Sequence, residues 1–304
     1  MNLLLSPASP ELNDSDFALL AHYAKHLGRA SKAARFSMKS GEKRSKQKGH
    51  GMEMLELRPY QTSDDLRHID WRVTARTGHT HTRLYAQEND HQRLLLVDLS
   101  PAAYFSTRYA FISTRFIQLA GLIAWRSEQQ GDKLLYSLNF ADKTSENFNK
   151  SSVWAMIKQL KNASKVSNRN YPLRQQLGWY KSKVAAKAHN KDIIILTDKQ
   201  DWDNEQQTAL QQLAKHNQIH WVQIFDHHSF ELPPGQYQFA DSEGTTSVNI
   251  TQKSAQQAKQ DFFEQNANMR QRLAKIGIRH QLFDISEPPE GIARYLLDQG
   301  ALRL

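Results

Sequence analysis

Residues 93–100 read Arg-Leu-Leu-Leu-Val-Asp-Leu-Ser and decide the fold predicted for this chain. Four consecutive apolar residues lead into Asp98, Leu99 and Ser100, and a proline follows. A short apolar run that ends in turn residues is typical of a strand buried on both faces, as in a parallel sheet. Ligands of open α/β sheets bind at the carboxyl ends of such strands. Asp98 and Ser100 come at that end, so the sequence predicts an oxygen-rich site there.

The residues after this strand alternate between helical and extended patterns. The expected strands are 133–140, 192–197, 219–226 and 278–285, and the expected hairpin pairs 236–240 with 247–251. The expected helices are 108–130, 153–160, 173–188, 202–216, 255–275 and 291–299. Strands separated by helices predict an α/β fold with a doubly wound, mostly parallel sheet over residues 91–304.

The composition is that of a globular but polar protein. Of its 304 residues, 39% are hydrophobic and 23% are charged. This length is enough for one large domain, or for one domain with an appendage, with a full core. There are no cysteines, which excludes disulfides and thiolate metal sites. The first residues lack the charged region of a signal peptide, and no apolar run approaches the roughly 20 residues of a membrane span. We therefore expect a cytoplasmic protein, either free or attached peripherally to the inner membrane.

Basic residues concentrate in an N-terminal arm within residues 1–50. The arm overlaps the end of an expected helix at 17–27. Between His22 and His50 it has nine basic residues against Glu42, which is most of the chain's net charge of +9. Such an arm is either a binding segment for nucleic acid, an anionic membrane surface or an acidic partner, or a solvated tether. The charges lack regular aromatic interleaving, which favours the tether. The nine residues are Lys25, Arg29, Lys32, Arg35, Lys39, Lys43, Arg44, Lys46 and Lys48.

Residues 51–90 are expected to form a small β-rich lead-in with two strands, 53–60 and 80–85. Between the strands lies a charged segment, whose acidic residues are expected to pair with its arginines in a network that ties the lead-in to the main domain. Ile69 and Trp71 are expected to pack beneath this network. No nucleophile, base or metal-ligand spacing accompanies the carboxylates, so a catalytic role is not favoured. The network consists of Asp64, Asp65, Asp70, Arg67, Arg72 and Arg76.

Three stretches together resemble the bacterial domain-of-unknown-function 58 (DUF58) family. They are Glu-Met-Leu-Glu-Leu-Arg-Pro-Tyr at 53–60, Asp-Asp-Leu-Arg-His-Ile-Asp-Trp-Arg-Val-Thr-Ala-Arg at 64–76, and Leu-Val-Asp-Leu-Ser at 96–100, with Arg83 and Glu88 between them. The resemblance implies a von Willebrand factor A-like domain with no enzymatic activity. It also implies an adaptor or client-binding partner of a MoxR-type AAA+ ATPase. Association with nucleic acid or an anionic membrane through the arm is the alternative.

The same resemblance points to a metal-ion-dependent adhesion site at the end of the strand 93–100. Such sites hold Mg²⁺ through the motif Asp-x-Ser-x-Ser, and here Asp98, Ser100 and the later Asp198 could supply oxygen ligands. Ala102 stands at the third position of the motif, so the site is degenerate. The favoured alternative is that Asp98 and Asp198 cap the N-termini of neighbouring helices.

Other candidate sites are weaker. His227 and His228 follow Asp226 at the end of an expected strand, where a surface turn is favoured over a site. His79 and His81 share a face of an expected strand, but two histidines without a third ligand are weak evidence for zinc. Neither of the glycine-rich phosphate-binding patterns, Gly-x-Gly-x-x-Gly and Walker, occurs in the chain.

Overall fold

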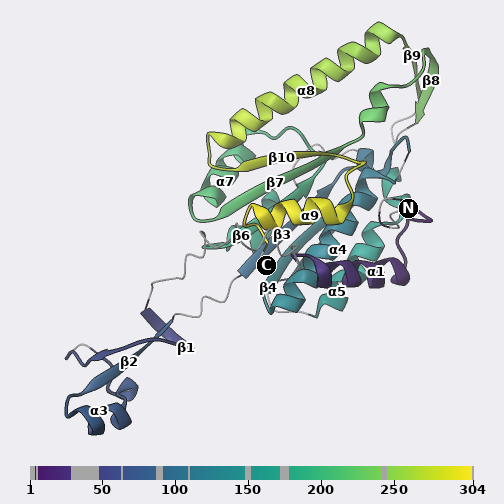
Figure 1. The fold of residues 1–304 in the computed structure, drawn as a ribbon. Helices are drawn as coiled ribbons and strands as arrows, with labels where there is room; N and C mark the ends of the chain where they lie inside the picture. The colour runs from purple at the N-terminus through teal and green to yellow at the C-terminus, as the bar shows by residue number, and fades with distance from the viewer. Residues whose placement is uncertain are drawn as a thin grey trace, which may run out of the picture. The chain divides into compact units, whose positions relative to one another are not determined.

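The computed structural model describes residues 4, 6–28, 48–62, 64–86, 92–108, 110–147, 152–171, 178–240 and 245–302. The chain divides into two compact units (Figure 1), one formed by residues 1–29 with 91–304 and the other by residues 30–90. Most of the basic arm, from Arg29 to Lys46, lies outside the described residues, so its expected role stays a prediction. Among the described residues, no helix is both long and apolar enough to cross a membrane.

A six-stranded sheet forms the centre of the larger unit, with the strand order β10-β7-β6-β3-β4-β5. Five of its strands are parallel, and β5 runs antiparallel to its neighbour β4. This arrangement confirms the predicted mostly parallel, doubly wound α/β fold. The strands are β3 (Gln92–Leu99), β4 (Lys133–Phe140), β5 (Lys143–Asn147), β6 (Asp192–Thr197), β7 (Gln218–Phe225) and β10 (Arg279–Asp284).

The side chains of β3 alternate between two cores, one on each face of the sheet. Leu95 and Val97 belong to one hydrophobic cluster, and Leu94 and Leu96 belong to the other. The run is continuously apolar because helices cover both faces (Figure 1). The first face is covered by α1 (Asp14–His26), α4 (Ile112–Gln130), α5 (Val153–Ala163) and α9 (Pro289–Asp298), and the second by α6 (Lys183–Ala186), α7 (Asn204–Lys215) and the end of α8 (Gln252–Ala274).

The N-terminal helix α1 packs against α4 in the first core. Asn13 caps its first turn, and Phe17 and Leu20 are buried. Gly121 of α4 allows the two helices to approach, because a Cβ there would lie 3.0 Å from Leu20 Cδ1. From the sequence this helix is grouped with the arm, whereas in the structure it belongs to the same unit as the sheet. Lys25, the first residue of the arm, lies in its last turn.

Two stretches of the larger unit differ from the expected elements. Strand β5 was not expected, and it pairs with β4 through a two-residue turn in which Ala141 has a φ of 53°. Residues 173–188 do not form one helix in their described part. That part holds the 3-10 helix η5 (Gly178–Lys181) and the short helix α6, and Ser182 between them accepts a hydrogen bond from the Ala185 amide as the cap of α6.

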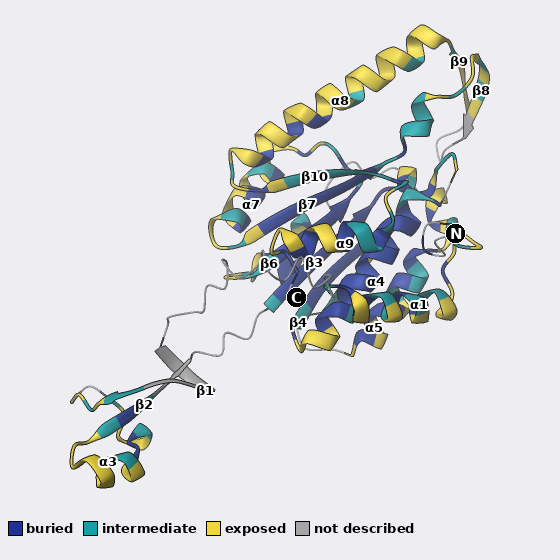
Figure 2. Cartoon of the chain, in the orientation of Figure 1, coloured by how far each residue is buried: buried dark blue, intermediate teal, exposed yellow. Residues whose placement is uncertain are grey.

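A long excursion, residues 226–278, separates β7 from β10. It contains the expected hairpin, which is confirmed as β8 (Gly235–Ala240) with β9 (Thr245–Ile250), and then the 23-residue helix α8. Figure 2 shows α8 exposed along most of its length. The buried residues of α8 are Asn266, Met269 and Leu273, all in its second half. The first half of α8 and the hairpin therefore contribute little to the core.

The smaller unit pairs β1 (Lys48–Pro59) with β2 (His81–Ala86), in keeping with the two expected strands. Between them lie the 3-10 helix η2 (Leu66–His68) and the helix α3 (Trp71–Thr77), neither of which was expected. Asp70 caps α3, and Gly78 ends it with a left-handed φ of 73°. Ile69 is buried as expected, but Trp71 is 68% exposed, so the expected packing of Trp71 beneath the network is wrong.

The ion pairs of the charged segment also differ from the expected ones. Asp64 pairs with Arg58 of β1 at 2.7 Å. Asp70 pairs with Arg83 of β2 at 2.9 Å. These partners come from the strands that flank the segment, whereas only partners within the segment were expected. Three other members of the predicted network are exposed on or beside α3, namely Arg67, Arg72 and Arg76, while Asp65 accepts a hydrogen bond from the Arg67 amide.

Candidate functional site

The carboxyl ends of β3 and β6 bring predicted site residues together. The two strands are parallel neighbours, with Asp98 in register with Thr197. Ser100 follows β3, and Asp198 follows β6. The Ser100 amide donates a hydrogen bond to Asp198 Oδ1 at 2.8 Å, and the Ser100 hydroxyl donates one to Asp198 Oδ2. Asp198 therefore holds the loop after β3 against the end of β6.

Asp98 is paired with a buried lysine whose role the sequence does not predict. Lys199 Nζ lies 2.8 Å from Asp98 Oδ1, and the two side chains are only 6% and 1% exposed. The Gly178 amide donates to Asp98 Oδ2 at 2.6 Å, so both carboxylate oxygens have donors. The one signal for Lys199 in the sequence is its position directly after Asp198, at the end of a buried strand.

Gly178 approaches Asp98 closely because it has no side chain. A Cβ at this position would lie 3.0 Å from Asp98 Oδ1 and 2.9 Å from Asn139 Cβ. Gly178 is also the first residue of η5, so its amide is one that the helical turn itself leaves without an acceptor. Asp98 thus orders the start of a neighbouring helical turn, which is close to the capping role favoured from the sequence.

Burial shifts the pKa of both carboxyl groups of the site, Asp98 and Asp198. Burial raises the pKa of Asp98, and the charge of Lys199 with its hydrogen bond opposes that rise. Burial likewise raises the pKa of Asp198, and the hydrogen bonds from Ser100 oppose it. Lys199 therefore favours the ionised form of Asp98 in a place where loss of water favours the neutral form.

These residues do not fit a magnesium ion. Mg²⁺ requires near-octahedral oxygen ligands at about 2.0–2.1 Å. The two Asp98 oxygens instead accept hydrogen bonds from an ammonium and an amide. Ser100 Oγ accepts a hydrogen bond from the Ala102 amide, at the position where the motif would have its second serine. Lys199 supplies the positive charge that an ion would bring, so an internal ion pair stands in place of the hypothesised degenerate metal site.

A small pocket of about 60 Å³ opens beside this ion pair. Sites for small molecules typically have volumes of about 300–1,000 Å³. The pocket is therefore too small to enclose a typical substrate. Its lining residues include Asp98 and Lys199 of the ion pair, Asn139 of β4, and Lys143 and Thr144 of β5.

The loop after β3 extends the site toward β7. We call residues 100–107 the β3 loop; it contains the 3-10 helix η3 (Pro101–Tyr104) and then Phe105, whose side chain is 50% exposed. Asp226, directly after β7, accepts hydrogen bonds from the Thr107 amide and hydroxyl, both at 2.7 Å. Asp198 and Asp226 thus fix the two ends of the β3 loop along the carboxyl edge of the sheet.

The remaining predicted residues lie elsewhere. The network around Asp64 and Asp70 belongs to the smaller unit, and the arm from Arg29 to Lys46 lies outside the described residues. His227 and His228 lie on the 3-10 helix η6 (His227–Phe230) at the same carboxyl edge as Asp98, two strands away from it.

Comparisons with known proteins agree with the motif resemblance. The model of a family described as protein of unknown function DUF58 matches residues 56–272. The uncharacterized protein Mb1516 of Mycobacterium bovis and the uncharacterized protein Rv1480 of Mycobacterium tuberculosis are each 35% identical to this chain over 86 residues. The matched part is 28% of this chain and 27% of each relative, so the match spans about a quarter of the length of these relatives.

Proposed function

This chain belongs to the DUF58 family of proteins of unknown function, and we propose that it is a non-enzymatic protein-interaction module. The proposed binding surface is the carboxyl edge of the sheet around the β3 loop. The observation that carries the proposal is the buried ion pair of Asp98 and Lys199, in which the chain itself supplies the cation that pairs with Asp98. A surface that is ordered before its partner arrives loses less conformational freedom on binding.

Phe105 is the proposed anchor for the partner. It is half exposed on a loop whose ends are held by Asp198 and Asp226. Aromatic side chains at such positions often carry a large share of a binding energy, because they bury much surface and lose little freedom. A second pocket, of about 160 Å³, offers a place for a side chain of the partner and is lined by Pro7, Pro10, Ser106, Thr107, Arg108, Ala110 and Phe111.

The partner implied by the family resemblance is a MoxR-type AAA+ ATPase. In this proposal the chain recruits a client or a regulator to that ATPase, in the cytoplasm or at the inner face of the membrane. The role requires binding and no turnover, and a pocket of about 60 Å³ beside the ion pair supports binding over small-molecule catalysis. Association of the basic arm with nucleic acid or an anionic membrane is the competing proposal.

Affinity purification of the tagged full chain from its native lysate tests the proposal. The purification is run with and without nuclease and ATP, at two salt concentrations, and bound proteins are identified by mass spectrometry. We expect an AAA+ ATPase to co-purify, to survive nuclease treatment and to be retained at the higher salt concentration. Binding through several phosphate contacts of the arm would instead lose orders of magnitude in affinity as salt rises.

Paired variants locate the binding surface. Phe105→Ala is expected to reduce the recovered ATPase strongly, since it removes the anchor from the β3 loop. Trp154→Ala is the matched control, because Trp154 is 63% exposed on α5 and lies outside the proposed surface. Equal recovery with both variants would reject the β3 loop as the docking surface. Recovery of only nucleic acid or lipid, removed by salt, would reject the adaptor role altogether.

A further inference from the structure

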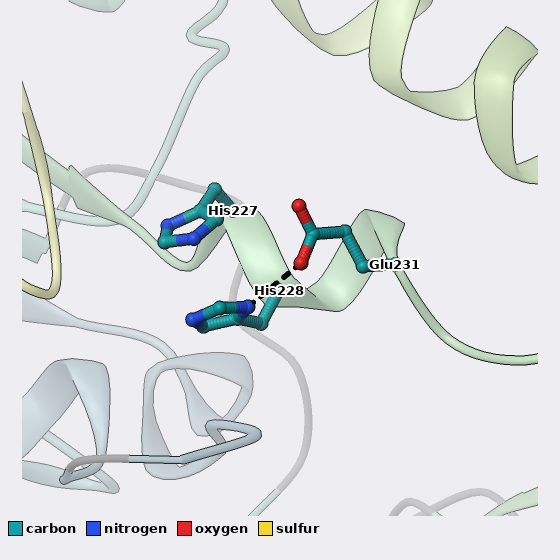
Figure 3. Close-up of side chains that lie close together, drawn as sticks. All are labelled: His227, His228 and Glu231. Atoms are coloured by element: carbon teal, nitrogen blue, oxygen red, sulfur yellow. Dashed lines mark hydrogen bonds and ion pairs between the residues drawn. The ribbon is translucent and has the colours of Figure 1, made fainter.

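Helix η6, at the carboxyl end of β7, carries a cluster of metal-ligating side chains. His227, His228 and Glu231 each offer a ligand atom, and these atoms lie within 4.8 Å of one another. Figure 3 shows the two imidazole rings next to each other and the Glu231 carboxylate facing His228. We propose that these three side chains bind a divalent transition-metal ion of the zinc type. The proposal does not depend on the protein partner proposed above.

A carboxylate on the neighbouring strand orients His227. Asp284 is the last residue of β10, and its Oδ2 lies 2.7 Å from His227 Nδ1 and accepts a hydrogen bond from the His227 amide. An ionised carboxylate only accepts hydrogen bonds, so Nδ1 donates to Asp284, and in the neutral imidazole this leaves the lone pair on Nε2. Histidines that bind zinc usually donate their other ring N–H to a carboxylate or carbonyl in this way. His227 is thus prepared to bind an ion through Nε2.

The backbone of η6 sets the spacing of the other two ligands. The His228 amide donates to Asp226 Oδ1 at 3.0 Å, and the Glu231 amide donates to the His228 carbonyl at 3.0 Å. These bonds place His228 Nδ1 2.8 Å from Glu231 Oε2. An ion that binds between the two groups replaces this hydrogen bond and leaves the bonds of the two amides intact.

The donor set selects the class of ion. Two imidazoles and one carboxylate form a set in which zinc commonly binds, with an open fourth position. Magnesium and calcium prefer oxygen ligands, so they are disfavoured here. The side chains of His227, His228 and Glu231 are 34%, 12% and 52% exposed, so solvent reaches the cluster and the fourth position is open to water or to a group from a partner.

Ion binding at this position would stabilise the start of the excursion between β7 and β10. The cluster lies immediately after β7, and the Phe230 ring within η6 packs against Phe262 of α8 with centroids 5.3 Å apart. An ion that joins the two ends of η6 therefore also restrains the aromatic contact that holds α8 to the sheet. We expect bound Zn²⁺ to raise the melting temperature of the larger unit.

Calorimetric titration of the untagged full chain with Zn²⁺, in excess Mg²⁺, tests the proposal. We expect one zinc ion to bind per chain. Asp284→Asn, which removes the carboxylate behind His227, is expected to weaken zinc binding by about 10–100-fold. His228→Ala and Glu231→Gln remove ligands and are expected to weaken it further. Melting curves in EDTA check that each variant folds, and Glu231→Gln changes an exposed side chain whose loss leaves the core intact.

Other neighbouring histidines provide matched controls. His189 and His216 have ring centroids 4.6 Å apart, and His22 and His26 have centroids 4.7 Å apart. We expect His216→Ala and His26→Ala to bind zinc like the unmodified chain. Loss of binding in these variants, or full binding by His228→Ala, would overturn the proposal, and so would the absence of zinc binding by the unmodified chain.

Discussion

The two ends of β3 carry buried ion pairs that differ in composition and surroundings. At the amino end, Arg93 Nη1 lies 2.7 Å from Asp132 Oδ2, and Arg93 also donates to the Ser127 hydroxyl and the Ala301 carbonyl. Burial lowers the pKa of the nearby Arg126, with the charge of Asp132 opposing this and that of Arg93 adding to it. One buried carboxylate therefore pairs with Arg93 and also offsets the charge of the buried Arg126.

At the carboxyl end the composition is reversed. The single ammonium of Lys199 lies beside Asp98, and the charge of the neighbouring Asp198 also interacts with both. A lysine stem is more flexible than a guanidinium fork with several partners, and this lysine lines a pocket and adjoins an exposed loop. The comparison teaches that the amino end fastens the strand to its surroundings, while the carboxyl end supports the loop that we propose as a binding surface.

The largest expected effect is at the amino end. Asp132→Ala leaves Arg93 and Arg126 buried without their carboxylate, which is expected to lower the free energy of unfolding by about 3–5 kcal/mol. Urea denaturation followed by circular dichroism measures this change in the free energy of unfolding. Lys161→Ala is the control, because its pair with Asp14 is 42% and 84% exposed and is expected to contribute less than about 1 kcal/mol. Similar losses in both variants would contradict the assignment of the amino end as a structural fastening.

The next effect is at the carboxyl end. Lys199→Met leaves the buried Asp98 without a cation and is expected to destabilise the protein by about 3 kcal/mol. Adding Asp98→Asn removes the stranded charge, so the double variant is expected to recover at least half of that loss. The same urea denaturation completes the double-mutant cycle. Purely additive losses would show that the two side chains are not coupled, and would remove the basis of the preformed site.

The next effect is a pH dependence of stability, and it involves His220 of β7 and His280 of β10 rather than either end of β3. Burial lowers the pKa of His220 and of His280 to about 4. Their pKa is higher in the unfolded chain, so this contribution to stability is complete above the unfolded value of about 6.5 and falls as the pH drops toward 4. Each histidine should reduce the free energy of unfolding by about 1.4 kcal/mol per pH unit within this window.

Unfolding experiments at pH 7, 6 and 5 measure this decline, and His280→Gln should make it shallower. The variant isolates one histidine from the carboxyl groups that also titrate in acid. An identical slope for the variant and the unmodified chain would show that His280 is not neutral and buried in the folded state.

The smallest expected effect is that of magnesium. Because Lys199 already provides the positive charge next to Asp98, millimolar Mg²⁺ is expected to leave the melting temperature unchanged. Thermal melts with Mg²⁺ or with EDTA check this, with Asp98→Asn as the control. A magnesium-dependent rise that disappears in Asp98→Asn would mean that Lys199 moves aside for an ion, and the two ends of β3 would then differ less than proposed.

The sheet could be predicted from the sequence, but the buried ion pair at the carboxyl end of β3 could not. The run 94–97 is apolar at every position because helices cover both faces of the sheet, and this leaves a clear compositional pattern. Lys199 leaves no such pattern, since lysine is almost always exposed and only the folded register turns this one toward Asp98. The partners of Asp64 and Asp70 were missed for a different reason, because Arg58 and Arg83 come from strands outside the charged segment.

Two elements that were not predicted, α3 and β5, differ in how clearly their sequences indicate them. Helix α3 had signals in the sequence, since Asp70 stands at its N-cap and Gly78 follows its last turn. The helix is only seven residues long, and its arginines also fit a pattern of ion pairs within the charged segment. Strand β5 has a polar sequence of five residues, and it exists because β4 offers an edge within reach of a two-residue turn. No local pattern could have revealed it.

The excursion between β7 and β10 has a consequence for how much the chain can change in length. The chain leaves the sheet at Phe225 and returns to a directly adjacent parallel strand at Arg279, so the sheet fixes both ends of the excursion. In between, the buried residues of α8 all lie near the return. Insertions between β8 and β9 would therefore lengthen the protein away from its core. A reporter domain placed there should fold beside the sheet without altering it.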